Sequence, residues 1–492
     1  MIIIYIGKKS MKNFHKTVGK KSLVILVVGF GFIFCPSITA QMSLTPDTIM
    51  SKKNVLLAEN ISPSVYDLLI IAPQKFINAL HPLINHKNNI GTRTHLVTLD
   101  EVYHQMFWYG RDKAEKIKYF IKTAIEEWEI RYVLLVGGRS SQFLPTWYCP
   151  VRYVSMVDDW DDGYLSDLYF ADIYDANGNF SSWDSDNDGM YGEWYIGETA
   201  QDTDMDLIPD VAVGRLPCRS EREARIMVQK IITYETTVFN QPWFSTMLVA
   251  AGDTYPEVSN ANWTGYEGEY YGDRAIENMS GFTTTRLYTS DGTFANKKDV
   301  IKEFRKGWGF VYLVGHGSPK QWGNNAPNGS EFIQGPNSND MWRFRNKDKL
   351  PICVVSGCHN SQFDVCLKRL FNSSTRWKQE YVPECWSERI IREPSGGAIG
   401  CIGCTGLGYT KEDKTSFKGG INELECAFFH AYGQDHITVL GDTWAAAVTW
   451  YSHTYPVEWN SSSLGDSWID TKVMQSWALL GDPSLKIGGY PL

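Results

Sequence analysis

The sequence predicts an α/β fold in which parallel β-sheets are flanked by helices and divided between two lobes. Short apolar runs alternate with helical patterns along most of the chain, which is typical of parallel strands joined by right-handed crossover helices. The length of 492 residues exceeds what one ordinary core accommodates, so two lobes are expected. The composition, with 14% aromatic and 21% charged residues, is that of a soluble globular protein.

The amino-terminal lobe is expected over residues 65–240. A helix is predicted from Ser220 to about residue 236, because Ser220 followed by Glu223 forms a capping box. A long segment rich in Asp, Gly, Trp and Tyr, residues 150–208, interrupts the alternation as an ordered excursion. The other elements are strands at 65–71, 95–97, 132–136 and 211–215, and helices at 76–84 and 113–129.

The second lobe is expected over residues 241–492. Its predicted strands are 247–252, 284–288, 310–315, 352–357 and 396–403. Helices are predicted around 273–279, 297–306, 386–392, 421–431 and 438–451, with a last helix over 468–479.

The amino end has the features of a targeting segment. Lys20 and Lys21 precede an apolar stretch, and the small residues that end at Ala40 suit cleavage, so residues 1–40 are predicted to be a signal peptide. The alternative is that this stretch is retained as a membrane anchor. Only in that case is the protein expected to associate with a membrane. Residues 41–64 are expected to be a linker or a short propeptide. The predicted location is therefore secreted or at the cell surface.

Charge argues against a nucleic-acid partner. The whole chain carries a formal net charge of -9. Removal of residues 1–40 takes away six lysines and no acidic residue, which leaves -15. A chain this acidic binds polyanions poorly but is compatible with divalent cations.

The cysteine count predicts one free thiol. Nine cysteines follow residue 40, and in an exported protein an odd cysteine can be a free reactive thiol while up to four disulfides hold the rest. Cys401 and Cys404 have zinc-like spacing, but no second such pair or histidine cluster accompanies them.

Two apolar runs each end in a reactive residue. Residues 310–315 lead into His316, and residues 352–357 lead into Cys358. The carboxyl edge of a parallel sheet is where ligands bind, and a cysteine with a histidine can form a thiolate nucleophile and its acid/base partner. The amides of Gly317 and Cys358 are the natural oxyanion donors, and Gly317 lacks a Cβ that would crowd a substrate. From spacing alone, the alternative is equally open: a core histidine and a core cysteine could stand at two strand ends by coincidence.

The segments GHGSPKQWG (315–323) and VVSGCHNSQFD (354–364) resemble the two active-site blocks of the gingipain family of secreted cysteine endopeptidases, in the caspase-like clan. The blocks DVAVGR (210–215), GAIG (397–400) and GDPSLKI (481–487) resemble that family in the same order. The resemblance spans about residues 65–487. It implies a caspase-like fold and a peptidase acting on proteins or peptides, with His316 as acid/base and Cys358 as nucleophile.

The chain also departs from the family pattern. His359, Asn360 and Ser361 differ from the residues usual after the nucleophile. The interval between His316 and Cys358 is longer, so a loop near 324–340 is expected to reshape the pocket rim. Neither a carboxy-terminal immunoglobulin-like domain nor a long inhibitory amino-terminal domain is expected.

The resemblance also bears on specificity. Gingipains cleave after Arg or Lys with an acidic pocket floor, which implies Asp273, with Glu269 beside it, as candidates here. A solvated carboxylate at a helix start is the alternative for Asp273. Asp253 is a candidate for orienting His316, and Trp322 for lining the pocket.

An acidic loop predicts structural calcium. Asp184, Asp186 and Asp188 alternate before Gly189, as in the opening of an EF-hand-type loop. Position twelve is Tyr195 instead of the usual Glu, so other acidic residues would complete the site, and the candidates are Glu193, Asp202, Asp204 and Asp206. A solvated acidic loop is the alternative.

The sequence therefore predicts a secreted cysteine endopeptidase that passes through a thioester. The alternative is a catalytically inactive surface or binding protein that keeps the same fold. The intact His-Gly and Gly-Cys pairs favour the enzyme.

Overall fold

The computed structural model describes residues 65–158, 160–195, 198–256, 266–413, 416–461 and 465–491. The predicted signal peptide (1–40) and linker (41–64) lie outside the described residues. Within these ranges no helix is long and apolar enough to cross a membrane.

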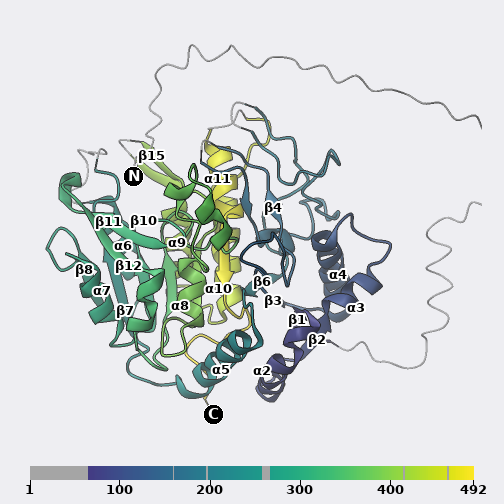
Figure 1. Cartoon of the computed structure of the whole chain (residues 1–492), viewed down its shortest axis with the longest axis horizontal. Helices are drawn as coiled ribbons and strands as arrows, with labels where there is room; N and C mark the ends of the chain where they lie inside the picture. The colour runs from purple at the N-terminus through teal and green to yellow at the C-terminus, as the bar shows by residue number, and fades with distance from the viewer. Residues whose placement is uncertain are drawn as a thin grey trace, which may run out of the picture. The chain divides into compact units, whose positions relative to one another are not determined.

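Ten strands form one continuous sheet, in the order β2-β1-β3-β6-β17-β14-β13-β9-β7-β8. Figure 1 shows its two ends, with β7 and β8 on the left and β1 and β2 on the right. All neighbouring strands run parallel except β14 and β17, which are antiparallel. The strands are β1 (Leu68–Ala72), β2 (Thr94–Thr98), β3 (Tyr132–Val136), β6 (Ala212–Leu216), β7 (Thr246–Ala251), β8 (Thr283–Tyr288), β9 (Phe310–Leu313), β13 (Ile352–Val355), β14 (Gly400–Cys404) and β17 (Trp477–Leu480).

The strands in the middle of each half are apolar because helices cover both faces of the sheet. Every residue of β1, β3, β9 and β13 is buried. Strands covered on both faces have no solvated side, so their sequences are continuous apolar runs instead of alternating ones. For this reason the short apolar runs in the sequence predict these strands.

The two predicted lobes each supply one side of this shared sheet. Strands β2, β1, β3 and β6 come from residues 65–240, and the remaining six come from residues 241–492. The two sides meet where β6 pairs with β17, through Leu480 opposite Arg215. The division into two lobes stays a prediction.

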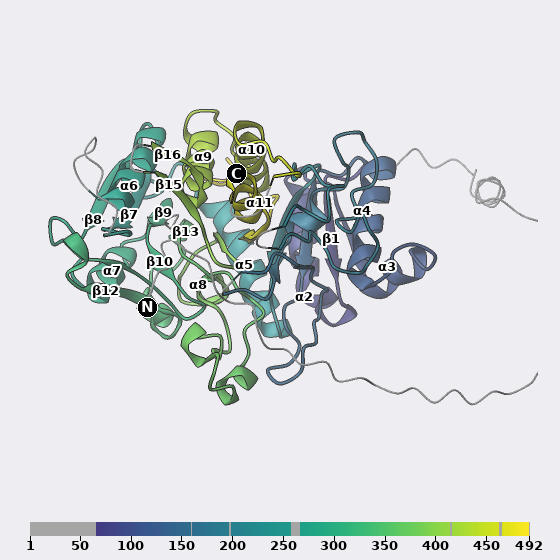
Figure 2. The ribbon, with the colours of Figure 1, turned by 90° about the horizontal axis from the view of Figure 1, so that it is seen from above.

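Helices pack on both faces of the sheet. On one face α6, α9, α10 and α11 contact one another in turn, and on the other α2, α5 and α8 do so (Figure 2). The helices are α2 (Ile77–Asn89), α3 (Leu99–Gln105), α4 (Lys113–Trp128), α5 (Glu221–Thr237), α6 (Glu267–Asn278), α7 (Lys297–Phe304), α8 (Trp386–Arg392), α9 (Ile421–Gly433), α10 (Leu440–Thr454) and α11 (Asp466–Gln475).

The last predicted helix is wrong in its second half. The prediction ran from 468 to 479, whereas α11 ends at Gln475 and residues 477–480 form β17. The run Trp-Ala-Leu-Leu is apolar throughout, so its pattern fits a buried helix turn and a buried strand equally well. The antiparallel pairing of β17 with Cys401–Cys404 decides for the strand.

Shorter elements surround the sheet edge where His316 and Cys358 lie. The antiparallel strands β10 (His316–Gly317), β11 (Gln321–Asn325) and β12 (Phe332–Asn337) form a small sheet, which contains the predicted rim loop. The ordered excursion at 150–208 contains β4 (Tyr153–Val154) and β5 (Tyr164–Leu165). A second hairpin is formed by β15 (Thr410–Asp413) and β16 (Ser416–Gly420).

The expectation of up to four disulfides is not met. All nine cysteines in the described part of the chain are free thiols, and eight of them are buried. Cys353 and Cys401, which lie opposite each other on β13 and β14, are both free. Cys358 is therefore distinguished by its partial exposure and not by being the odd cysteine.

Candidate active site

His316 and Cys358 lie level with each other at the carboxyl edge of the sheet. Leu313 of β9 is the register partner of Val355 of β13, and each reactive residue follows three positions after its strand's last paired residue. Parallel neighbours carry equivalent positions to the same edge of a sheet. The predicted juxtaposition of the two strand ends is thus present in the register.

The ring of His316 is buried and held by a backbone carbonyl. Its Nε2 lies 2.6 Å from the carbonyl oxygen of Thr254. A carbonyl only accepts, so Nε2 carries a proton and donates it, and in the neutral ring the basic nitrogen is then Nδ1. The rings of Tyr255 and Phe332 lie 5.6 and 6.3 Å from that of His316. Phe332 belongs to β12, so the predicted rim loop reaches the histidine.

Asp253, the predicted orienter of His316, immediately precedes Thr254. Asp253 is buried, and its backbone N–H donates to the carbonyl oxygen of Asn325 at 3.2 Å. The carbonyl of the next residue, Thr254, contacts His316 Nε2, and the sequence does not predict this contact. A role for the Asp253 carboxylate stays a prediction.

The thiol of Cys358 is partly exposed, and its sulfur contacts a backbone amide. The N–H of Gly408 donates to Sγ at 3.4 Å. Burial raises the pKa of the Cys358 thiol to about 11, while the Gly408 amide lowers it. An amide donor favours the thiolate because it stabilises the charged form of the sulfur. Gly408 follows β14 at the same edge, which is the sequence signal that could have identified it.

The backbone at Gly317 passes very close to the backbone at Cys358. A Cβ added at Gly317 would lie 2.6 Å from the Cys358 carbonyl oxygen and 2.3 Å from Asn360 Oδ1. A Cβ added at Gly357 would lie 2.9 Å from the Gly317 nitrogen. Both positions therefore require glycine. The role of the Gly317 and Cys358 amides as oxyanion donors stays a prediction.

Asn360 ties the loop that follows Cys358 to the loop that follows His316. Its Nδ2 donates to the carbonyl oxygens of Ser318 at 2.8 Å and Gln321 at 3.0 Å. The side chain is fully buried, and its Oδ1 has no hydrogen-bond partner. Asn360 is one of the residues in which the chain departs from the family pattern, and nothing in the sequence predicts this contact.

A family model described as peptidase family C25 matches residues 61–488. The chain belongs to this family. It is therefore a cysteine-type peptidase, in agreement with the resemblance of its two active-site blocks.

The relatives of this C25 peptidase are distant. An uncharacterised protein of Archaeoglobus fulgidus is 22% identical over 422 residues, covering 81% of this chain and 91% of that protein. Gingipain R2 of Porphyromonas gingivalis is 22% identical over 428 residues, covering 85% of this chain but 46% of the gingipain. The chain thus spans about half the length of that gingipain.

Solved structures share the fold. The crystal structure of the Arg-specific cysteine proteinase gingipain R has a TM-score of 0.57 and 17% identity, covering 87% of this chain and 79% of the gingipain chain. The complex of the pro- and mature domains of a Porphyromonas gingivalis gingipain has a TM-score of 0.56 and 17% identity, covering 86% and 79%. The α/β architecture predicted from the sequence is confirmed, and these gingipain structures share it.

The predicted pocket residues of this C25 peptidase already have partners. Asp273 accepts hydrogen bonds from Arg286 Nε at 2.7 Å and from the Tyr288 hydroxyl at 2.8 Å. Glu269 is buried and accepts from the N–H and hydroxyl of Ser290. Burial raises the pKa of Glu269. Both carboxylates therefore stabilise the contact between α6 and the end of β8.

Trp322, predicted to line the pocket, is fully buried. Its ring stacks on that of Phe294 at 5.4 Å between centroids. A Cβ added at Gly335 would lie 2.3 Å from the ring of Trp322, so β12 passes directly over it. Trp322 belongs to β11 of the small sheet and pairs with Gly317, so its packing helps to fix the strand that carries His316.

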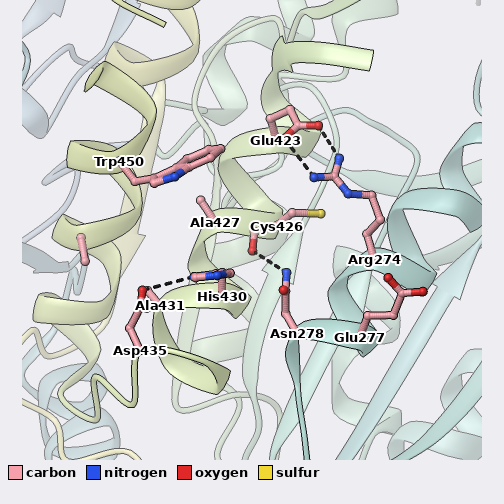
Figure 3. A pocket seen from close by; sticks show the side chains of 11 residues that line it. Arg274, Glu277, Asn278, Glu423, Cys426, Ala427, His430, Ala431, Asp435 and Trp450 are labelled. Atoms are coloured by element: carbon pink, nitrogen blue, oxygen red, sulfur yellow. Dashed lines mark hydrogen bonds and ion pairs between the residues drawn. The ribbon is translucent and has the colours of Figure 1, made fainter. Parts of the chain in front are cut away.

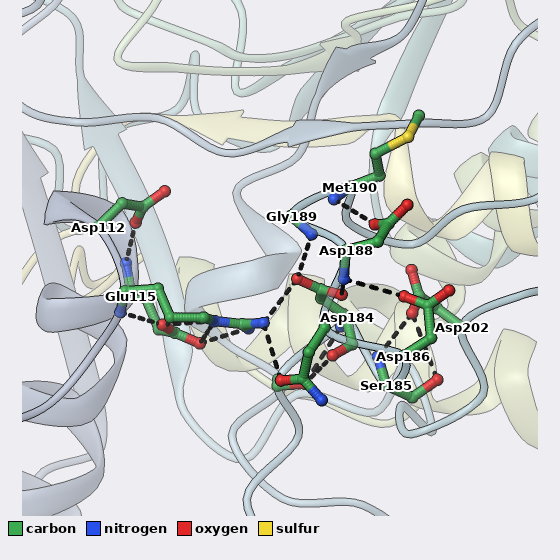
Figure 4. A network of polar contacts seen from close by, with 12 residues as sticks. Asp112, Glu115, Asp184, Ser185, Asp186, Asp188, Gly189, Met190 and Asp202 are labelled. Carbon is green, nitrogen blue, oxygen red and sulfur yellow. Dashed lines mark hydrogen bonds and ion pairs between the residues drawn. The ribbon is translucent and has the colours of Figure 1, made fainter. Parts of the chain in front are cut away.

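The acidic loop brings three of its predicted calcium ligands together (Figure 4). Asp184, Asp186 and Asp188 each offer a carboxylate oxygen, and these oxygens lie within 4.8 Å of one another. Asp184 is buried and also accepts from Arg111 Nη1 at 2.6 Å. Asp202 accepts from the amides of Ser185 and Glu193 behind the loop.

The other predicted ligands lie around this cluster. Asp204 accepts from the N–H and hydroxyl of Ser182, and its second oxygen is buried without a hydrogen-bond partner. Asp206 accepts from the Ile208 N–H. Glu193 is buried, and burial raises its pKa. Residues 184, 186 and 188 are thus the best candidate ligands, with the others in supporting positions.

A separate pocket of 210 Å³ lies between α6, α9 and α10 (Figure 3). Arg274 and Glu423 form an ion pair at its wall, and His430 contacts Asp435 at 3.2 Å. Neither His316 nor Cys358 lines this pocket. It is not part of the site at the strand ends.

Proposed function

We propose that this peptidase is an endopeptidase that uses Cys358 as its nucleophile and His316 as its acid/base. The observation that supports this most is the register of β9 and β13, which brings His316 and Cys358 level while the Gly317 backbone abuts residues 357–358. Proteins or peptides are the substrates.

The proposed reaction has two halves. His316 Nδ1 accepts the thiol proton, and the Cys358 thiolate attacks the carbonyl carbon of the peptide bond. The resulting oxyanion accepts hydrogen bonds from the amides of Gly317 and Cys358. The imidazolium then donates its proton to the leaving amine, which leaves a thioester. Water attacks that thioester with His316 as base, which releases the acid and regenerates the thiol.

For specificity we propose cleavage after basic residues. One similar structure is described as Arg-specific, and one relative is named Lys-gingipain. Asp273 is the more exposed candidate for the acidic floor, although a substrate cation would have to compete with Arg286 for it. Glu269 is the second candidate.

Calcium is proposed as a structural ion at Asp184, Asp186 and Asp188. Three clustered carboxylates repel one another unless a cation neutralises them, and calcium prefers such oxygen ligands. Arg111 supplies one positive charge to Asp184, which is the competing way to balance the cluster. Isothermal titration with calcium that gives neither heat nor a rise in melting temperature would contradict the proposal.

Export is proposed from the basic, apolar and small-residue order of positions 20–40. Expression of the full chain with mass spectrometry of the released protein tests it. A mature amino terminus at residue 41 is the expected result. Retention of the intact chain in the membrane fraction would favour an anchor instead.

The decisive test of the peptidase itself combines turnover with covalent labelling. Wild-type protein is incubated with fluorogenic peptides that differ in the residue before the cut, and with a thiol-directed probe. Cys358→Ala should lose both turnover and labelling, whereas Cys366→Ala, which removes a buried thiol, should keep both. Absence of turnover and labelling in the wild type, with and without calcium, would favour the inactive binding protein.

A further inference from the structure

Three segments that are distant in sequence meet behind Cys358. Asp161 lies between β4 and β5, Lys472 lies on α11, and residues 406–408 follow β14. Asp161 and Lys472 are both buried. The mechanism proposed above uses none of these side chains.

Asp161 fixes the backbone next to the nucleophile. Its Oδ2 accepts a hydrogen bond from the Leu407 N–H at 2.7 Å and one from Lys472 Nζ at 3.0 Å. A Cβ added at Gly406 would lie 3.0 Å from the same oxygen, so the loop is seated directly on the carboxylate. His359 Nε2 lies 3.5 Å from Asp161 Oδ1.

The residues around Asp161 hold it in place. Asp158 accepts from the Asp161 N–H at 2.7 Å and from the Tyr409 hydroxyl at 2.9 Å. Lys472 also forms an ion pair with Asp158. The titratable groups around Asp161 are thus Lys472, His359, Asp158, Tyr164 and Tyr409, and burial raises the pKa of both tyrosines.

The loop that Asp161 holds is the loop that contacts the sulfur. Leu407 is followed by Gly408, whose N–H donates to Cys358 Sγ at 3.4 Å. On the other side of Leu407, the carbonyl oxygen of Gly406 accepts from the His359 N–H at 2.8 Å. The loop is therefore fixed to Asp161 at its centre and to the nucleophile's own segment at both ends.

We propose that Asp161 is a positioning residue for the nucleophile, which holds Leu407 so that the Gly408 amide stays aimed at the Cys358 sulfur. This inference rests on the proposed function of Cys358. A buried ion pair is weak support for stability, since apolar residues of similar volume often replace one without loss. An amide held against a thiolate, in contrast, stabilises the reactive form.

Two effects of Asp161 on the sulfur oppose each other. The negative charge of Asp161 raises the pKa of the Cys358 thiol, whereas the Gly408 amide that it holds lowers this pKa. Asp161→Asn and Asp161→Ala both remove the charge, but only Asn keeps an oxygen that can accept from the Leu407 N–H. The difference between these two variants therefore isolates the positioning effect from the charge.

The experiment measures the rate at which iodoacetamide alkylates Cys358 between pH 7 and 9.5, with peptide mapping to confirm the site. We expect Asp161→Ala to react about tenfold more slowly than Asp161→Asn at each pH, as a higher thiol pKa requires; tenfold corresponds to about one pKa unit. Asp162→Ala, which removes the adjacent exposed carboxylate, should react like the wild type.

A second comparison keeps the charge constant. Asp161→Glu retains the carboxylate but moves it by one methylene, and we expect it to react several-fold more slowly than the wild type. Labelling of the eight buried cysteines would reveal that Asp161→Ala fails to fold. In that case the comparison of Asp161→Glu with the wild type tests the positioning role. Equal rates for Asn and Ala, or for Glu and the wild type, would overturn the inference. A wild-type Cys358 that does not react at all would instead contradict the proposed function.

Discussion

The side-chain amide of Asn360 donates to the carbonyl oxygen of Ser318 at 2.8 Å, which joins the segment after Cys358 to the segment after His316. A second hydrogen bond runs from the same Nδ2 to Gln321. The distance between His316 and Cys358 therefore depends on a residue that takes no part in proton transfer.

Asn360→Ala should lower kcat/KM by about tenfold to a hundredfold. Loss of two buried hydrogen bonds costs about 1–3 kcal/mol, which lets the two loops separate. Fluorogenic peptide assays and thermal unfolding check this together. Asn372→Ala, at an exposed position, is the control and should leave both values unchanged. Full activity in Asn360→Ala would show that the strands alone hold His316 and Cys358 in their relative positions.

Alkylation of wild-type Cys358 should accelerate about tenfold per pH unit between pH 7 and 10. Burial raises the pKa of this thiol to about 11, so the reactive thiolate is a small fraction that grows tenfold with each pH unit. Iodoacetamide rates across this range measure it. A plateau that begins below pH 8 would indicate instead that His316 and Cys358 form an ion pair in the resting enzyme.

Calcium should raise the melting temperature of the wild type, and Asp186→Ala should abolish that rise. A ligand present at a hundred times its Kd stabilises the folded state by about 2.7 kcal/mol, which is several degrees for a chain of this size. Asp186 is exposed, so its replacement leaves the core intact. Asp175→Ala, in a neighbouring acidic turn, should keep the calcium response. An equal calcium-induced rise in melting temperature in both variants would exclude the loop at 184–188 as the calcium site.

Glu425→Gln should stabilise the protein at alkaline pH and change little at pH 5. Burial raises the pKa of Glu425 to about 8 from an ordinary value of 4.5, so the folded state keeps a proton that the unfolded state releases. Stability therefore falls as the pH rises from about 4.5 to about 8, and glutamine removes this loss. Melting temperatures of both proteins at pH 5 and pH 8.5 test it. If the melting temperatures of both proteins change by the same amount between pH 5 and pH 8.5, Glu425 is ionised in the folded state.

The strands could be predicted because the sheet is covered on both faces. Tyr132–Val136 coincides with β3, and the runs before His316 and Cys358 coincide with β9 and β13 within two residues. The same argument does not separate a strand from a buried helix turn where a short apolar run directly follows a helix. The run at 477–480 is apolar in either conformation, and only its partner β14, some 75 residues earlier, determines that it is a strand.

The place of His316 and Cys358 at the sheet edge could be predicted from the sequence, but the residues packed around them could not. His316 and Cys358 each follow an apolar run, so local pattern places them at the sheet edge. Asp161 and Lys472 lie about 310 positions apart in the sequence. No motif around either residue indicates that they contact each other beside Leu407. Polar residues in an irregular excursion show no periodicity, so tertiary packing alone reveals what they contact.

The place of β17 in the sheet also bears on when activity can arise. Among the described strands it is the last to be synthesised, yet it lies at the centre of the sheet, between β6 and β14. A ribosome thus releases both reactive residues well before the element that joins the two halves. Pairings between distant segments form slowly, because they close long loops. The two halves of the sheet therefore join only after synthesis has passed residue 480, so the complete fold of this peptidase arises only at the end of translation.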